Sequence, residues 1–164
     1  MDSIPISRAG YELKKRELEE LEAQRPEIIK AIAEAREEGD LSENAGYHAA
    51  RERQGWLEAK ISLIKTNMTK YNVIEPGQIN SDKVAFSATV ELENLETEEK
   101  ITYLLMGPDD TDFYEGAISV ASPVGRALLG KVEGDEVVVQ VPKGRVEYEV
   151  LSITYTNPQP KKQP

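Results

Sequence analysis

Two carboxylates in the first half of the chain have the residue types and the spacing that favour metal binding. Asp40 and Glu43 lie three residues apart within AREEGDLSENAGYHAA, residues 35–50. If a helix begins at Asp40, both groups lie on one side of its first turn, where the helix dipole favours ionised carboxylates. Two hard oxygen donors suit Mg²⁺ rather than zinc. Because Mg²⁺ keeps much of its hydration shell, the pair predicts an incomplete site that takes further ligands from a partner.

A second interpretation of the same pair is purely structural. Asp40 is a favoured N-cap residue, and Glu43 would then occupy the third helical position of a capping box. Such a cap stabilises its helix by about 1 kcal/mol and requires no metal. The residues alone leave both interpretations open.

Basic and aromatic side chains flank the acidic pair. Arg36 lies one turn before Asp40, and Arg51 lies two to three turns into the following helix. This spacing is typical of a solvated helix face with ion pairs such as that between Arg36 and Asp40. Tyr47 is near enough to the turn to stack on a base, but a packing role at the end of the hairpin is favoured. His48 is the only histidine and lacks the neighbours that metal or nucleophilic catalysis needs, so we expect it to be structural.

The acidic pair lies at the junction of two predicted long helices. Apolar residues recur at heptad spacing before the junction and in alternating steps of four and three after it, as in the seam of a coiled coil. The break at Gly39-Asp40 is too short for a crossover, so we expect an antiparallel hairpin whose second helix spans about 41–72. Pro26 predicts a kink in the first helix, or its end and restart. The predicted seam comprises Tyr11, Leu18, Leu21, Ile28, Ile32 and Ala35, and then Ala50, Gln54, Leu57, Ile61, Ile64, Met68 and Tyr71.

Beyond Glu75-Pro76-Gly77 the apolar period changes to two, which indicates strands. Ser122 is the expected N-cap of a short helix over 123–129, with Gly130 after its end. Pro142-Lys143-Gly144 predicts the turn of a hairpin between the last two strands. Strands are expected over 84–95, 100–106, 135–141 and 145–155.

These patterns predict an α+β chain with two domains and a tail. The expected hairpin domain spans 1–75, and a small, mostly antiparallel sheet domain with one short helix spans 78–155. The polar, proline-rich segment 156–164 is expected to be disordered.

Composition excludes several classes of protein. The chain has no cysteine, which excludes disulfides, thiolate metal sites and cysteine nucleophiles. A net charge of −10 argues against a sequence-independent grip on DNA. No apolar run reaches the roughly 18 residues of a membrane span, and the N-terminus lacks a signal peptide pattern. We therefore expect a cytoplasmic protein without membrane contact.

The chain also resembles a known family, the GreA/GreB transcript-cleavage factors of bacteria, from Ile4 to Tyr155. The most specific stretches are RPEIIKAIAEAREEGDLSENAGYHAARERQG, residues 25–55, and SPVGRALLGKVEGDEV, residues 122–137. Few basic residues near the turn favour the less basic branch of the family. Where the family usually has an acidic residue, this chain has Gly46, which leaves the expected ligand pair intact.

The resemblance implies an elongation factor that is a catalytic cofactor of bacterial RNA polymerase and not itself an enzyme. The hairpin would enter the secondary channel, where Asp40 and Glu43 help to hold the second catalytic Mg²⁺ during hydrolysis of backtracked nascent RNA. Arg36 and Arg51 would contact that RNA. The FKBP-like sheet domain would dock on the rim of the channel through Ser119, Ser122 and Pro123, and its fold implies no isomerase activity.

Three alternatives stand beside the function that the resemblance implies. The chain could be a coiled-coil adaptor in which the acids only cap, or a polymerase inhibitor that enters the same channel without promoting cleavage. The retained GDLSENA sequence disfavours the inhibitor. An autonomous nuclease is disfavoured because two carboxylates do not build a complete two-metal site. The expected state of the protein is a monomer.

Overall fold

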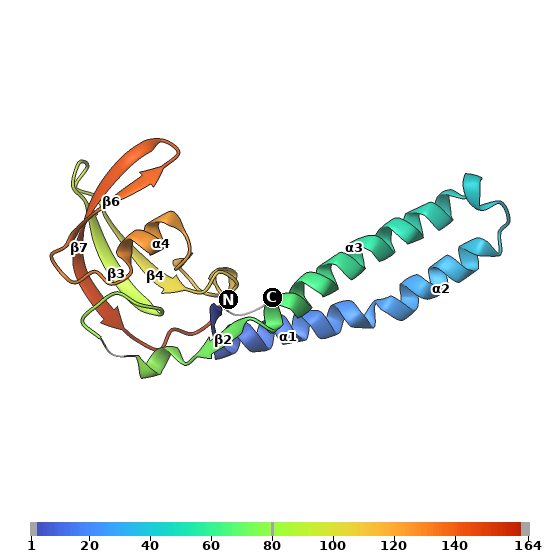
Figure 1. Ribbon diagram of the computed structural model, residues 1–164, viewed down its shortest axis with the longest axis horizontal. Helices are drawn as coiled ribbons and strands as arrows, with labels where there is room; N and C mark the ends of the chain where they lie inside the picture. The colour runs from blue at the N-terminus through green and yellow to red at the C-terminus, as the bar shows by residue number, and fades with distance from the viewer. Residues whose placement is uncertain (1–2, 80, 162–164) are drawn as a thin grey trace. The chain divides into compact units, whose positions relative to one another are not determined.

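The structure, a computed structural model, describes residues 3–79 and 81–161 (Figure 1). Among these residues, no helix combines the length and the apolar character that crossing a membrane requires. In chain order the elements are β1 (Ile4–Ser7), α1 (Arg8–Ala23), α2 (Arg25–Arg36), α3 (Ala45–Met68), β2 (Tyr71–Ile74), β3 (Ala88–Asn94), β4 (Lys100–Met106), β5 (Ala117–Ser119), α4 (Pro123–Leu128), β6 (Glu136–Val141) and β7 (Gly144–Tyr155), with short 3-10 turns at Leu41–Glu43, Pro76–Gln78 and Thr111–Phe113.

The chain forms two compact units. The sheet unit comprises Met1–Tyr11 together with Tyr71–Pro164, and the helical unit comprises Glu12–Lys70. The expected α+β class, with a helical hairpin and a sheet domain that carries one short helix, is confirmed. Residues 1–11 and 71–75, which the sequence places with the hairpin, belong to the sheet unit.

In the helical unit, α2 and α3 run side by side in opposite directions and are joined by a turn (Figure 1). Apolar side chains at heptad spacing meet between them, because only one stripe of each helix faces the other. The buried seam consists of Ile28, Ile32 and Ala35 from α2 and Ala50, Leu57, Ile61 and Ile64 from α3. Leu18 and Leu21 of α1 are partly buried against the same cluster.

The first helix is interrupted where Pro26 predicts it. Helix α1 ends at Ala23 and α2 begins at Arg25, with Pro26 in the first turn of α2. Proline is tolerated there because the first amides of a helix have no intrahelical acceptor. The long first arm is therefore two helices in succession.

Helix α3, the second helix of the predicted hairpin, is shorter at both ends than expected. It begins at Ala45 rather than about 41, and it ends at Met68. Tyr71, predicted as a seam residue, instead begins β2, which pairs in parallel with β1 in the register Ile4 to Tyr71. A periodicity of three and four does not reveal this change, because β1, the pairing partner of β2, precedes the first helix and lies far away in the chain.

The sheet unit is built on five strands in the order β5-β4-β3-β7-β6. The pairs β3–β4, β3–β7 and β6–β7 are antiparallel, while the short β5 runs parallel to β4. Alternate residues of β3 and β6 are buried, as the period of two predicts, whereas β4 buries three successive residues, Leu104–Met106. The main buried cluster comprises Val84, Ala88, Val90, Leu92, Leu105, Leu128, Val137 and Val150.

One predicted strand begins later than expected. Residues 84–87 precede β3 in irregular backbone, because Ser87 has a φ of 71° and its amide donates to the Leu105 carbonyl at 2.6 Å. Val84 and Phe86 are nevertheless buried, so the apolar pattern reports burial and not strand geometry. In the tail, the Lys161 amide donates to the Phe113 carbonyl at 2.6 Å, and residues 162–164 of the predicted disordered segment lie outside the described residues.

Candidate functional site: the acidic turn of the hairpin

The turn between α2 and α3 begins at a glycine. The Glu38 and Gly39 amides donate to the carbonyls of Ala35 and Arg36 as α2 ends. Gly39 has a φ of +116°, a conformation that side chains disfavour. The chain then passes through the 3-10 turn Leu41–Glu43, which carries the acidic pair away from the seam.

Asn44, and not Asp40, caps the second helix. Its Oδ1 accepts from the Tyr47 amide at 2.9 Å, and its side-chain amide donates to the Ala35 carbonyl at 2.6 Å. One side chain thus satisfies the start of α3 and the end of α2 together. The predicted capping box of Asp40 and Glu43 is therefore wrong. In the sequence, Asn44 is a favoured N-cap residue three positions before Tyr47, but Asp40 is an equally favoured one.

Asp40 instead forms a small turn with Ser42. Its Oδ1 accepts both the Ser42 hydroxyl at 2.8 Å and the Ser42 amide at 3.0 Å. These hydrogen bonds, from the hydroxyl first and then the amide, lower the pKa of Asp40 below its ordinary value. The carboxylate is therefore fixed in orientation and ionised at neutral pH, although it is exposed to solvent.

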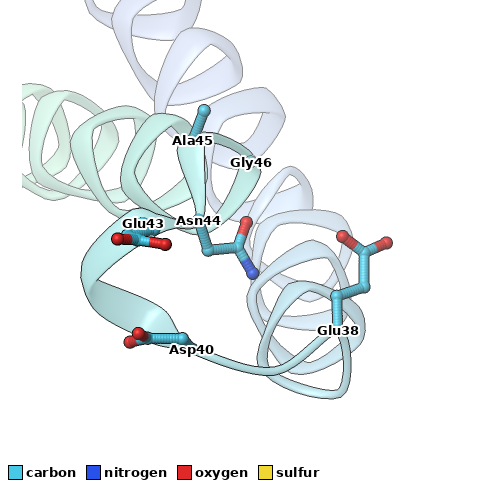
Figure 2. A pocket seen from close by; sticks show the side chains of 6 residues that line it. All are labelled: Glu38, Asp40, Glu43, Asn44, Ala45 and Gly46. Carbon is cyan, nitrogen blue, oxygen red and sulfur yellow. The ribbon is translucent and has the colours of Figure 1, made fainter.

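The Glu43 carboxylate lies on the same side of the turn as that of Asp40, while Glu38 points to the other side (Figure 2). These residues, with Asn44, Ala45 and Gly46, line one open recess. Among the described residues, Glu43 makes no hydrogen bond or ion pair that would neutralise it. Two exposed anionic oxygen ligands on one side suit a hard, hydrated cation such as Mg²⁺.

The described chain alone does not complete such a site. Within residues 3–79 and 81–161, no group of three or more His, Cys, Asp or Glu side chains could hold a metal ion. The acidic pair does not form the capping box, and the structural role that Asp40 keeps is its turn with Ser42. The arrangement fits a pair of ligands that is presented outward and completed by another molecule.

The flanking side chains differ in how they are held. The Arg36 guanidinium lies over the Tyr47 ring at 5.8 Å, within the range of a cation–π contact. Tyr47 packs against the helical core and meets the His48 ring at 5.5 Å, edge to face. Arg51 is exposed and donates to Gln54 at 3.3 Å. The Arg36–Asp40 ion pair expected from their spacing does not form, because α2 ends between them and Asp40 turns toward Ser42.

Ser119, Ser122 and Pro123 lie together in the sheet unit, at the end of β5 and the start of α4. Ser122 caps α4 by accepting from the Gly125 amide at 3.0 Å, and its hydroxyl donates to the Ser119 carbonyl at 2.6 Å. The Ser119 hydroxyl oxygen accepts from the Ala121 amide at 3.0 Å. A side chain at Gly125 would meet the Ser119 carbonyl oxygen at 2.1 Å. The predicted cap is confirmed, and it holds these residues in one rigid turn.

Comparison with known proteins accounts for both units. Residues 4–73 match the family model described as "Transcription elongation factor, N-terminal", and residues 79–155 match "Transcription elongation factor, GreA/GreB, C-term". The class that these two units define is a transcription elongation factor with a helical hairpin and a sheet domain.

Relatives of known name extend over nearly the whole chain. The protein named "Transcription elongation factor GreA" of Maridesulfovibrio salexigens is 56% identical over 158 residues, which cover 96% of this chain and 99% of the relative. A protein of the same name from Neisseria meningitidis is 48% identical over 94% of this chain and 99% of its own length. The chain belongs to the GreA/GreB family, as its sequence resemblance indicated.

Solved structures of related proteins were also found. The GreA factor homolog 1 protein of Thermus thermophilus is 28% identical, with 93% of this chain and 99% of that chain covered, at a TM-score of 0.44. The GreA/GreB elongation factor of Nitrosomonas europaea is 22% identical, with 94% and 100% covered, at a TM-score of 0.41.

Proposed function

We propose that this elongation factor stimulates hydrolysis of backtracked nascent RNA by bacterial RNA polymerase, and that Asp40 and Glu43 are the residues it lends to the reaction. The observation that carries the proposal is the placement of two carboxylates on one side of an exposed turn, with Asp40 oriented by Ser42. The turn is the end of a narrow hairpin, a shape suited to the secondary channel that leads to the polymerase active centre.

In this proposal the two carboxylates supply ligands to a Mg²⁺ ion that the polymerase holds in part. When bound, such an ion stabilises negative charge on the phosphate and lowers the pKa of a bound water. Asp40 contributes an oxygen that its hydrogen bonds with Ser42 already orient, so little order is lost on binding. Glu43 contributes a second oxygen from the same side. The chain is thus a cofactor of a reaction whose active site belongs to its partner.

The remaining predicted residues act through binding. Arg36 and Arg51 would attract the phosphates of the displaced RNA 3′ end, with Arg36 held in place by Tyr47. The rigid turn of Ser119, Ser122 and Pro123 would dock on the rim of the channel. A single chain in the cytoplasm, as a monomer, would suffice for these contacts.

A comparison of RNA alone with RNA in a stalled, backtracked elongation complex tests the proposal. With this protein and Mg²⁺, RNA in the complex should shorten from its 3′ end, while free RNA should remain intact. Cutting of free RNA would make the protein an autonomous nuclease. Binding to polymerase without any cleavage would make it a channel inhibitor or adaptor.

A further inference from the structure

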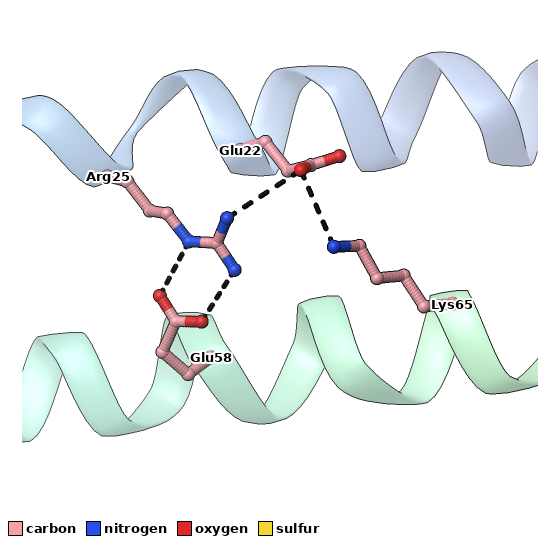
Figure 3. A network of polar contacts seen from close by, with 4 residues as sticks. All are labelled: Glu22, Arg25, Glu58 and Lys65. Atoms are coloured by element: carbon pink, nitrogen blue, oxygen red, sulfur yellow. Dashed lines mark hydrogen bonds and ion pairs between the residues drawn. The ribbon is translucent and has the colours of Figure 1, made fainter.

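The hairpin carries a charged network well away from its acidic turn. The Arg25 guanidinium donates to Glu58 through Nη2 at 2.7 Å and through Nε at 2.8 Å (Figure 3). Arg25 also lies 3.6 Å from Glu22, which in turn lies 3.7 Å from Lys65. The network therefore joins the end of α1, the start of α2 and the middle of α3.

The network spans the one interruption in the first arm. Helix α1 stops at Ala23, and Arg25 is the first residue of α2, so two separate helices meet at this point. Pro26 lacks an amide hydrogen and weakens the backbone connection there. Glu22 lies before the break and Arg25 after it, and both are paired with residues of the continuous helix α3.

The paired arginine has the geometry that fixes a register. Its two parallel hydrogen bonds to one carboxylate are satisfied at a single lengthwise position of α2 against α3. The hydrogen bonds from Arg25 also lower the pKa of Glu58, so the acceptor is ionised at neutral pH. Half-exposed ion pairs add little stability in general, but a polar pair beside an apolar seam specifies register.

A register set at Arg25 is transmitted to the turn. From Arg25 to the end of α2 is roughly 17 Å, and from Glu58 back to the start of α3 is roughly 20 Å, at about 1.5 Å per residue. Both stretches are uninterrupted helix joined through the Asn44 bridge. A slip or bend at the network would therefore displace Asp40 and Glu43 relative to any partner that holds the rest of the hairpin.

We propose that Arg25 is a positioning residue for the acidic turn, acting through its paired contact with Glu58 across the break in the first arm. The proposal rests on the proposed function of Asp40 and Glu43. It assigns no contact between Arg25 and RNA or metal.

The test measures position and activity separately in the full chain. Because the chain lacks cysteine, Glu37→Cys and Glu52→Cys can carry spin labels at exposed positions near the turn, one directly after α2 and one in α3. Distances would be recorded by pulsed electron paramagnetic resonance in the parent and in Arg25→Met, Glu58→Gln and Arg25→Lys. The matched control is Arg16→Met on α1, since Arg16 is exposed and makes no ion pair among the described residues.

We expect one narrow distance distribution in the parent and in Arg16→Met, and a broadened or shifted one in Arg25→Met and Glu58→Gln. Arg25→Lys keeps the charge but not the paired geometry, so it should be intermediate. In unlabelled chains, Arg25→Met should lower the maximal cleavage rate about tenfold, because small displacements of reacting groups cost much rate. The factor concentration at half-saturation should stay within about twofold, with helical content unchanged by circular dichroism.

Two results would overturn the proposal. One is a narrow, unshifted distribution in both Arg25→Met and Glu58→Gln. The other is a broadened distribution with the maximal cleavage rate of the parent, which would make the network a feature of hairpin order only. Failure of the proposed function looks different, because the parent chain itself would then fail to stimulate cleavage while its distances still report whether Arg25 sets the register.

Discussion

Asp40 is the residue at which structural and chemical roles are now separable. Its Oδ1 holds the Ser42 turn, a task that a neutral amide oxygen also performs. Asp40→Asn should therefore leave the thermal midpoint unchanged within error. The same change removes the negative charge that a Mg²⁺ ligand needs, so stimulated cleavage should fall by at least about tenfold at limiting Mg²⁺.

The measurement is cleavage rate against Mg²⁺ concentration for the parent, Asp40→Asn and Glu43→Gln, with thermal melts beside it. Raised Mg²⁺ should rescue both variants in part, since weaker retention of an ion is overcome by mass action. Both variants should still compete with the parent for polymerase. Parent-like rates in both at limiting Mg²⁺ would refute the ligand assignment.

Asp110 gives a prediction on pH. Its side chain is fully buried and accepts from the Ser7 amide at 3.0 Å, the Ser7 hydroxyl at 2.9 Å and the Gly107 amide at 3.2 Å. Burial, partly offset by these hydrogen bonds, raises its pKa from 3.8 to about 6, and the nearby Asp109 charge adds to the rise. Because the folded state holds this proton more tightly than the unfolded state, stability should increase as pH falls from 7 toward 4.

The expected gain is at most about 3 kcal/mol, from the size of the pKa difference. It can be measured by urea denaturation at pH 7 and pH 4, followed by near-ultraviolet circular dichroism, since six of the seven tyrosines lie in the sheet unit. In Asp110→Asn the difference in stability between the two pH values should disappear, because Asn does not titrate and the Ser7 hydroxyl can donate or accept. An unchanged difference in this variant would assign the pH dependence to other groups.

At the scale of elements, the closure of the hairpin depends on Asn44. Asn44→Ala removes both the cap of α3 and the hydrogen bond to the end of α2, so it should destabilise the helical unit by about 1 to 2 kcal/mol. Asn44→Asp keeps the capping oxygen and loses the donor to Ala35. Its stability should therefore lie between that of the parent and that of Asn44→Ala. Urea denaturation followed by the fluorescence of Trp56, the single tryptophan, measures this. Equal stability in all three chains would show that Asn44 does not hold the turn.

The sequence predicts a helix or a cap correctly where a pattern of nearby residues determines it. The seam residues Ile28 and Ile32 of α2 lie about one turn apart, as do Leu57 and Ile61 of α3. The cap residue Ser122 likewise lies within one turn of the Gly125 amide from which it accepts a hydrogen bond. The start of α3 was misplaced because Asp40 and Asn44 are both good caps, and only the contact of Asn44 with Ala35 separates them. The strand at Tyr71 was missed because its pairing with Ile4 lies far away in the chain.

The sequence predicts the candidate site only in part, because local patterns determine some of its features and not others. The identities of Asp40 and Glu43 followed from residue type and spacing, but their shared direction depends on a 3-10 turn that has no strong pattern. The hydrogen bonds of Asp40 to Ser42 and the Arg25–Glu58 pair are contacts between polar residues that also suit a solvated surface. Periodicity marks apolar burial, and it does not choose partners among exposed polar side chains.

At the scale of the whole molecule, the first residues of the chain complete the sheet unit. Strand β1 pairs with β2, and Ser7 supplies two of the hydrogen bonds that Asp110 accepts. The close fit is visible at two glycines, since a side chain at Gly10 would meet Asp110 at 1.9 Å and one at Gly107 would meet the Pro5 carbonyl at 1.8 Å. The helical unit is therefore an insertion between two segments of the sheet unit.

That connectivity predicts a chain that folds without its hairpin. The Tyr11 and Tyr71 rings meet edge to face at 6.2 Å, so a short Gly-Ser linker can join these residues in place of 12–70. The shortened protein should unfold cooperatively and compete with the full chain for polymerase, without stimulating cleavage. A fragment of residues 76–164 should be less stable by several kcal/mol, because Asp110 loses its Ser7 donors and the β1–β2 pair is absent. Thermal melts of both proteins, and a competition assay of each against the full chain, test this prediction. Equal stability of the shortened protein and the fragment would show that residues 1–11 do not stabilise the sheet unit.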